Sequence, residues 1–227
     1  MRSLGTGFWI AVVVAAVGFL VVPYQILDTP NEQKMGFIQK IFYFHVPCAG
    51  MLFLSTFVCA GGSIAFLFKG SERGDRLAHA AGELSVLFGV CVLTSGPLWG
   101  RKAWGTWWQW DARLTSSLLL FLMMVGYLLA RRYGGPAARK LAAALALFAA
   151  INVPLVYKSV DIWEGIHPKT TVVMTLDKSM RLAFASAFVL ITLLWALLLT
   201  VRVRLENARA ELAELRLDAE DLVEAQR

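Results

Sequence analysis

The sequence predicts an all-α integral membrane protein with six transmembrane helices. Of its 227 residues, 58% are hydrophobic and 17% are charged, a composition typical of proteins embedded in a bilayer. Six windows lack nearly all Lys, Arg, Asp and Glu, and each can cross about 30 Å of hydrocarbon as a helix. These windows are residues 8–27, 41–68, 78–98, 114–130, 141–157 and 182–201.

The order of these windows predicts one membrane domain followed by a short tail. The first window follows Arg2 as a secretory signal would, but it has no convincing small-x-small cleavage site, so we interpret it as a retained span. The six spans assign residues 1–204 to the membrane domain and leave residues 205–227 as a charged C-terminal helix. Its leucines follow a spacing near a heptad, but in so charged a segment we favour a solvated helix over a specific coiled-coil contact. They are Leu205, Leu212, Leu215 and Leu222.

Six spans place both termini on one side of the membrane. The connections 28–40, 99–113 and 158–181 then share the opposite face, whichever way the protein is inserted. The terminal face carries 13 Lys and Arg residues and the other face 9, so the positive-inside rule predicts cytoplasmic termini.

Charge and cysteine placement exclude several other classes of protein. The net charge of +6 is scattered over short loops, which indicates contact with lipid headgroups and not with nucleic acid. Cys48, Cys59 and Cys91 lie in apolar windows without a CxxC or CxxCH pattern, so we expect no disulfide, zinc site or covalent haem attachment to this chain. The sequence has no Walker motif, and ATP hydrolysis by this chain is not predicted.

The stretch WGTWWQWDARLTS, residues 104–116, is the most unusual feature of the sequence. A charged side chain at the centre of the membrane costs about 2.5–3.5 kcal/mol, so this segment, with Asp111 and Arg113, belongs at the outer surface. An interfacial aromatic belt explains one or two tryptophans, but five of the chain's eight lie in this short region. They are Trp99, Trp104, Trp107, Trp108 and Trp110.

The surplus of indoles favours a wide, flat, apolar ligand, because indoles offer rigid π-faces. Gly105 would allow close approach of backbone or ligand. Arg113 and Arg101 suit carboxylates on such a ligand, while Asp111 is expected either to pair with Arg113 or to cap the following helix. A planar macrocycle with two carboxylates is haem.

The positions of the histidines also favour haem as the bound molecule. His45 and His167 are expected on the same face as the tryptophan-rich loop, where the two imidazoles could ligate the iron from its two sides. Without CxxCH, such a haem would be the non-covalent b type. His79 is expected at the opposite face with a structural role, and Glu83, one helical turn on, is its expected partner.

The stretch WGTWWQWDARLTS resembles the tryptophan-rich WWD signature of haem-handling membrane proteins, and its WDARLTS ending resembles the CcmC family of cytochrome c maturation. The length and the six-span pattern agree over nearly the whole chain. The resemblance implies a bacterial inner-membrane protein that binds haem at its periplasmic surface and presents it to the haem chaperone CcmE. Carried onto this chain, the ligands are His45 and His167. The platform is Trp104, Trp107, Trp108, Trp110 and Asp111.

The same resemblance implies a complex with the ABC transporter CcmAB and the small membrane subunit CcmD. It leaves open whether the chain assists the covalent attachment of haem to the chaperone. The chain departs from the family pattern where Pro168 follows His167 in place of a glutamine, and where HVPCAG lacks an aromatic residue after the proline.

Two other functions compete with haem presentation. A haem transporter needs a route through the membrane, but Glu83 and Asn152 are among the few polar candidates in the spans, so transport by this chain alone is disfavoured. A quinol-linked haem oxidoreductase would need further histidines within the outer half of the bilayer, and the sequence has none there.

Overall fold

The computed structural model describes residues 4–33, 35–163, 165–168 and 170–224. In this part of the chain, six helices are long and apolar enough to cross a membrane, which confirms the predicted fold class. The α-helices are α1 (Thr6–Asp28), α2 (Phe42–Lys69), α3 (Glu72–Trp104), α4 (Ala112–Tyr133), α5 (Gly135–Ile162) and α6 (Lys178–Glu224), and the 3-10 helices are η1 (Phe37–Ile41) and η2 (Thr170–Thr175).

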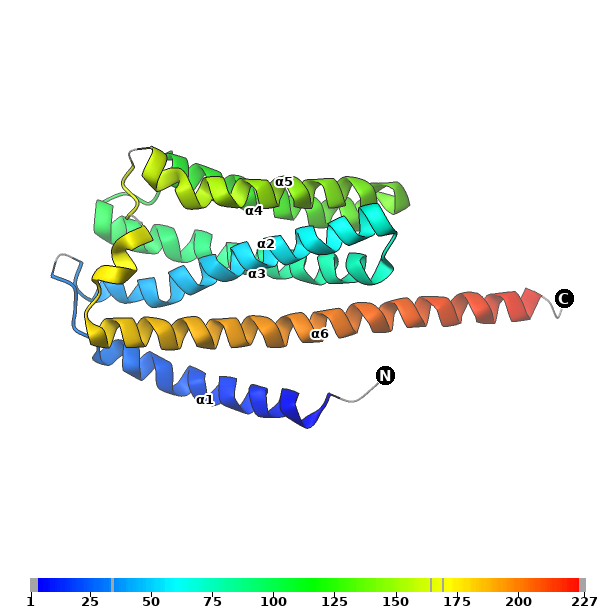
Figure 1. Cartoon of the computed structure of the whole chain (residues 1–227), viewed down its shortest axis with the longest axis horizontal. Helices are drawn as coiled ribbons and strands as arrows, with labels where there is room; N and C mark the ends of the chain where they lie inside the picture. Colours follow the sequence, from blue (N-terminus) through cyan, green and yellow to red (C-terminus); the bar gives the residue numbers. More distant parts are fainter. Residues whose placement is uncertain (1–3, 34, 164, 169, 225–227) are drawn as a thin grey trace.

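The helices are arranged as a bundle with α2 and α3 at its centre. The pair α4 and α5 lies on one side of α2 and α3, and α6 lies on the other side with α1 packed against it (Figure 1). The described ends of the chain point to the same end of the bundle as the turns α2–α3 and α4–α5, and the three other connections meet at the opposite end (Figure 1). This is the alternation that the sequence predicts.

Several helices extend beyond the apolar windows. The helix α3 continues past Arg101 to Trp104, where Gly105 takes a left-handed conformation with φ 76° and ends it. The helix α6 runs without a break through residue 205, so the predicted membrane domain and the predicted tail share one helix. A hydropathy window stops at the first charges, but a helix can continue into the headgroup region, where its charged side chains are solvated.

The helices α2 and α3 cross closely near the turn that joins them. A Cβ atom built on Gly62 would lie 2.5 Å from the carbonyl oxygen of Gly74, so only glycine allows this approach. Small residues at such a crossing are typical of membrane helix pairs, because backbone packing replaces the hydrophobic effect there. Ser71 caps α3 by accepting a hydrogen bond from the backbone N–H of Gly74 at 3.1 Å.

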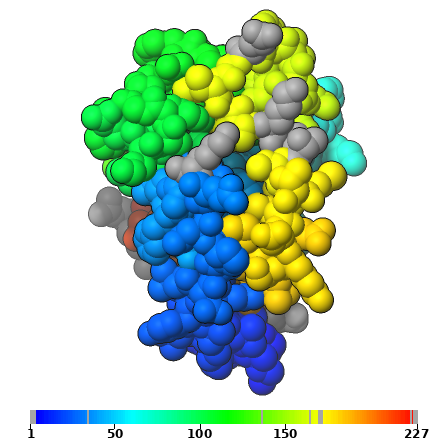
Figure 2. Space-filling model, turned by 90° about the vertical axis from the view of Figure 1, so that its left-hand side faces the viewer, coloured from blue at the N-terminus to red at the C-terminus, as the bar shows by residue number. Residues whose placement is uncertain are grey.

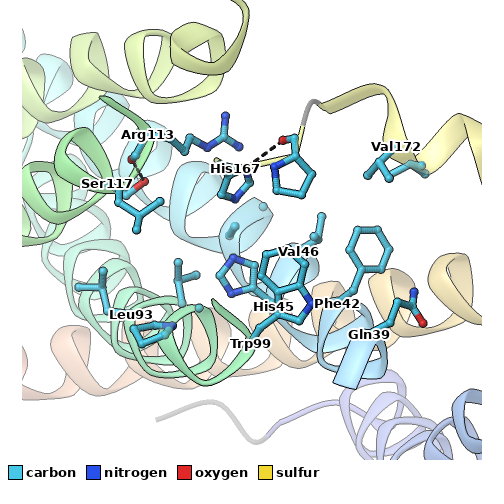
Figure 3. A pocket seen from close by; sticks show the side chains of 18 of the residues that line it. Gln39, Phe42, His45, Val46, Leu93, Trp99, Arg113, Ser117, His167 and Val172 are labelled. Atoms are coloured by element: carbon cyan, nitrogen blue, oxygen red, sulfur yellow. Dashed lines mark hydrogen bonds between the residues drawn. The ribbon is translucent and has the colours of Figure 1, made fainter. Parts of the chain in front are cut away.

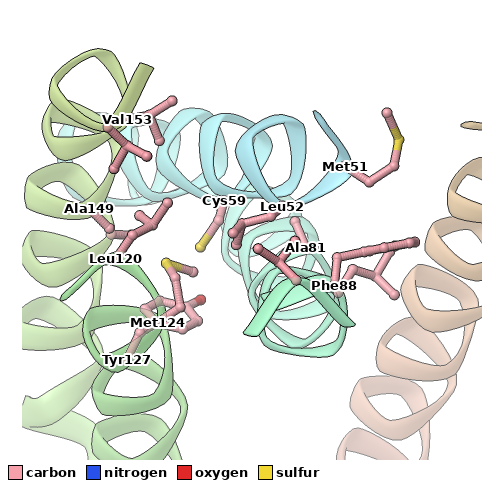
Figure 4. Close-up of a cluster of buried hydrophobic side chains, with 14 of the residues drawn as sticks. Met51, Leu52, Cys59, Ala81, Phe88, Leu120, Met124, Tyr127, Ala149 and Val153 are labelled. Atoms are coloured by element: carbon pink, nitrogen blue, oxygen red, sulfur yellow. The ribbon is translucent and has the colours of Figure 1, made fainter. Parts of the chain in front are cut away.

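The core lies between α2, α3, α4 and α5. Leu52, Cys59, Phe88, Leu120 and Met124 are buried there together (Figure 4). The cysteines are free thiols, with Cys59 fully buried, as the sequence indicates. A well-packed apolar core of this kind fixes the relative positions of the helices that carry the loops.

Hydrogen bonds between polar side chains join the helices within this apolar surrounding. The hydroxyls of Thr56 on α2 and Ser85 on α3 lie 2.8 Å apart. The indole of Trp195 on α6 donates to Ser55 at 2.8 Å. Each such bond in a membrane protein is worth about 0.6 kcal/mol on average, so these contacts orient the helices more than they stabilise them.

At the end of the bundle that carries the termini, acidic residues of α3 pair with basic residues of the other helices. Asp75 accepts hydrogen bonds from Arg131 of α4 at 2.8 Å and from Arg139 of α5 at 2.7 Å. His79 lies at this end as predicted, but its expected partner was wrong. Its Nδ1 lies 3.0 Å from Glu206 of α6, whereas Glu83 pairs with Arg202 of the same helix.

The substitution Asp75→Ala is expected to destabilise the bundle strongly. The carboxylate is buried, and its removal leaves the part-buried guanidinium of Arg131 without its ion-pair partner, a change that typically costs about 3–5 kcal/mol. Glu72→Ala is the matched control, because this exposed carboxylate also pairs with Arg139 but should contribute less than about 1 kcal/mol. Unfolding of the purified protein in mixed micelles measures both, and equal effects of the two substitutions would contradict this assignment.

Candidate functional site

A cavity of about 480 Å³ lies at the end of the bundle where the α1–α2, α3–α4 and α5–α6 connections meet, which we call the loop-bearing end. This volume falls within the range of about 300–1,000 Å³ that is usual for small-molecule sites. Segments from the three connections surround this end of the molecule, as the blue, green and yellow surfaces of Figure 2 show. The residues that line the cavity come from α2, α3, α4, α5, α6, η1, η2 and the intervening loops, so distant parts of the sequence form one site.

His45 lines this cavity from the first turn of α2. Its Nδ1 lies 2.9 Å from the hydroxyl oxygen of Ser95 on α3. A Cβ atom on the neighbouring Gly96 would lie 3.3 Å from Cε1 of the His45 ring, so glycine leaves room for the imidazole at this position. The packing of α2 against α3 therefore holds the ring from behind and leaves its other edge toward the cavity (Figure 3).

His167 reaches the same cavity from the connection between α5 and η2 (Figure 3). Its Nδ1 lies 2.9 Å from the carbonyl oxygen of Pro168, and a carbonyl only accepts, so Nδ1 carries the proton. Burial, with a smaller contribution from the nearby positive charge of Arg113, lowers the pKa of His167 to about 4. The imidazole is therefore neutral at pH 7, with the lone pair of its Nε2 available.

Four tryptophans line the cavity beside the histidines. They are Trp99, Trp104, Trp107 and Trp108. The ring centroid of Trp104 lies 4.8 Å from that of Trp99 in an edge-to-face contact and 6.3 Å from that of His167. The indole nitrogens of Trp99 and Trp108 are buried and have no hydrogen-bond partner among the described residues. Buried donors usually find an acceptor, so a ligand with acceptor groups would complete this lining.

Arg113 also lines the cavity, and its guanidinium is anchored to α5. One nitrogen, Nη1, donates to the carbonyl oxygens of Val156 at 2.9 Å and Tyr157 at 3.0 Å. This side chain therefore joins α4 to α5 and places a positive charge at the wall of the cavity. Arg101 lies instead over the ring of Trp107, with its guanidinium carbon 6.0 Å from the centroid.

Three of the predicted site residues lie outside the lining of the cavity. Trp110 is 76% exposed and packs edge-to-face on Trp108. Asp111 caps α4, since its Oδ1 accepts a hydrogen bond from the backbone N–H of Leu114 at 2.8 Å. Gly105 ends α3, and its carbonyl oxygen accepts a hydrogen bond from Arg101. These residues shape the loop that carries the tryptophans.

Comparison with known proteins shows the family to which this chain belongs. Residues 2–222 match the model of a family described as CcmC, heme exporter protein C. The chain belongs to the CcmC family. It is 35% identical to the heme exporter protein C of Bradyrhizobium diazoefficiens over 218 residues, covering 92% of this chain and 81% of that protein. It is 32% identical to the protein of the same name from Escherichia coli K12, covering 91% of this chain and 88% of the relative.

Membership in the CcmC family confirms the resemblance that the sequence suggests, and with the six apolar helices it makes the chain a multi-pass membrane protein. The structure adds cavity residues that sequence reasoning missed. Trp99 belongs to the tryptophan cluster but was not predicted as a site residue, although its presence in that cluster was a signal. Ser95 beside His45, and Met180 and Phe188 of α6, carried no sequence signal.

Proposed function

We propose that this CcmC-family chain binds b-type haem in the cavity and presents it at the outer, periplasmic face of the bacterial inner membrane. One observation carries this proposal: His45, His167 and four tryptophans, which come from distant segments of the chain, line a single cavity. The iron would be held between the two imidazoles, and the indoles would contact the flat macrocycle. Haem is the cargo of this site.

The residues of the cavity fit haem in two respects. Neutral imidazole is a common axial ligand of haem iron, and the lining contributes two. Arg113 and the unpartnered indole nitrogens of Trp99 and Trp108 could meet the carboxylates of the macrocycle. Within the described residues, no three His, Cys, Asp or Glu side chains are placed to hold a metal ion.

The depth of the cavity favours presentation over transport through this chain. On α2 the lining ends at Phe53, on α3 it begins at Val92, and on α6 it ends at Phe188. The cavity therefore reaches only part of the way along these helices from the loop-bearing end. A chain that moves haem across the membrane by itself would need a path along their remaining length.

We infer that a haem chaperone of the CcmE type receives the haem at the mouth of this cavity. The exposed indoles of Trp107 and Trp110 offer an apolar surface on the same loop. The family further supports a complex with CcmAB and CcmD on the membrane, with ATP hydrolysis in the transporter and not in this chain. Membrane lipids would contact the apolar outer surfaces of the helices.

Transfer of haem from this chain to the chaperone tests the proposal. The chain, loaded with haem in nanodiscs, is mixed with the soluble domain of a CcmE-type chaperone, and haem on the chaperone is followed by spectroscopy and mass spectrometry. We expect haem to move to the chaperone and not to a control protein of equal charge. In sealed vesicles, the chain alone should not carry haem to the lumen. Luminal haem without transfer to the chaperone would favour the transporter and overturn the proposal.

A further inference from the structure

We propose that Ser95 is a positioning residue that fixes His45 in one tautomer, with the proton on Nδ1 and the lone pair of Nε2 directed toward the cavity. The inference rests on the proposed function, because it concerns how this histidine is prepared for the haem iron. Ser95 is buried on α3, and His45 belongs to α2, so the contact joins two helices that pack along their lengths.

The proton count at Ser95 decides between the two tautomers of His45. The Ser95 hydroxyl lies 2.6 Å from the carbonyl oxygen of Cys91 and 2.9 Å from Nδ1 of His45. A hydroxyl has one proton, and a carbonyl can only accept. If Ser95 donates to Cys91, its oxygen must accept from Nδ1–H of the imidazole.

The opposite tautomer forms fewer hydrogen bonds. Ser95 would then donate to an unprotonated Nδ1 and no longer to the carbonyl of Cys91, and the proton on Nε2 of His45 would point away from Ser95. The Nδ1–H tautomer therefore makes two hydrogen bonds where the other makes one. Since each such hydrogen bond contributes about 0.5–1.5 kcal/mol, the first arrangement is favoured.

His167 has the same protonated nitrogen, Nδ1, but a different hydrogen-bond partner. Its Nδ1–H donates to the carbonyl oxygen of Pro168, which leaves its Nε2 unprotonated as well. Both histidines therefore offer the same nitrogen, one held by a side chain of a neighbouring helix and the other by its own backbone. Partners of this kind orient ligating histidines, raise their basicity and typically change metal affinity about 10- to 100-fold when removed.

The protonation of His45 can be measured without haem. The chain has only three histidines, so 15N spectra of the histidine-labelled, haem-free protein in detergent resolve each ring. We expect His45 to show a protonated Nδ1 and an unprotonated Nε2, and a spectrum with the proton on Nε2 would overturn the inference. Ser95→Ala should shift the His45 signals toward a mixture of tautomers and leave those of His167 unchanged.

Haem binding gives the second readout. Ser95→Ala should weaken haem binding roughly 10-fold and raise the midpoint potential of the haem, because the less basic ligand stabilises the ferric state less. Ser95→Thr keeps the hydroxyl and should restore both values. Thr94→Ala is the matched control, because Thr94 makes the same bond to a carbonyl one turn back on α3 but is exposed and lies outside the cavity lining.

Failure of the inference differs from failure of the proposed function. If His45→Ala loses haem while Ser95→Ala keeps the tautomer, affinity and potential of the unsubstituted protein, then the histidine binds iron and Ser95 does not position it. If His45→Ala binds haem normally, the proposed function is wrong, and the 15N spectra alone decide the protonation of the ring.

Discussion

His45→Ala and His167→Ala are each expected to abolish the bis-histidine haem spectrum of the purified protein. Both rings line one cavity, and each would supply one of the two protein bonds to the iron. Removal of a group that only supports a ligand costs about 10- to 100-fold in affinity, so removal of a ligand should cost more than about 100-fold. Absorption spectra and haem content after purification, at equal protein concentration, measure the loss.

His79→Ala is the control for this experiment. His79 lies at the opposite end of the bundle, where it pairs with Glu206, so its loss should leave the haem spectrum unchanged. Added imidazole should partly restore the spectrum of His45→Ala and of His167→Ala, because a free ligand can fill the space that the side chain leaves. A normal spectrum in both outer variants would contradict the assignment of these histidines as ligands.

The fold could be predicted from sequence because each transmembrane span can be recognised from its own run of apolar residues. A run of apolar residues must form a helix in lipid, where the backbone has no water to bond with, and the alternation of spans then assigns each loop to a face. That reasoning placed His45 and His167 at the same end of the bundle. It could not show that the two rings share a cavity, because the packing angles of α2, α3 and α6 depend on contacts between distant residues.

The roles of the residues near the tryptophans could be predicted only in part from the sequence. The apolar window ended at residue 98, but α3 continues to Trp104, which brings Trp99 and Trp104 into contact and makes both part of the lining. Asp111 had two expected roles, and only the described geometry distinguishes the cap of α4 from a pair with Arg113. Rotation about a helix axis and the exact helix end are not encoded in composition.

Trp104→Ala is expected to weaken haem binding, whereas Trp110→Ala should affect only the transfer of haem. Trp104 lines the cavity against Trp99 and His167, but Trp110 is outside the lining and exposed. Stacking of a flat ring on an aromatic side chain is worth about 1–3 kcal/mol in nucleobase recognition. For Trp104→Ala this corresponds to roughly 5- to 150-fold in the Kd for haem.

The two substitutions separate the indoles that hold haem from those available to a partner. Haem titration in nanodiscs gives the Kd of each variant, and the rate of haem appearance on the chaperone gives the transfer step. Trp110→Ala should keep the Kd and slow the transfer, because an exposed indole is a typical anchor of a protein interface. Trp104→Phe keeps an aromatic face and should recover most of the affinity. Equal losses of haem affinity in Trp104→Ala and Trp110→Ala would contradict the assignment of the macrocycle to the cavity that Trp104 lines.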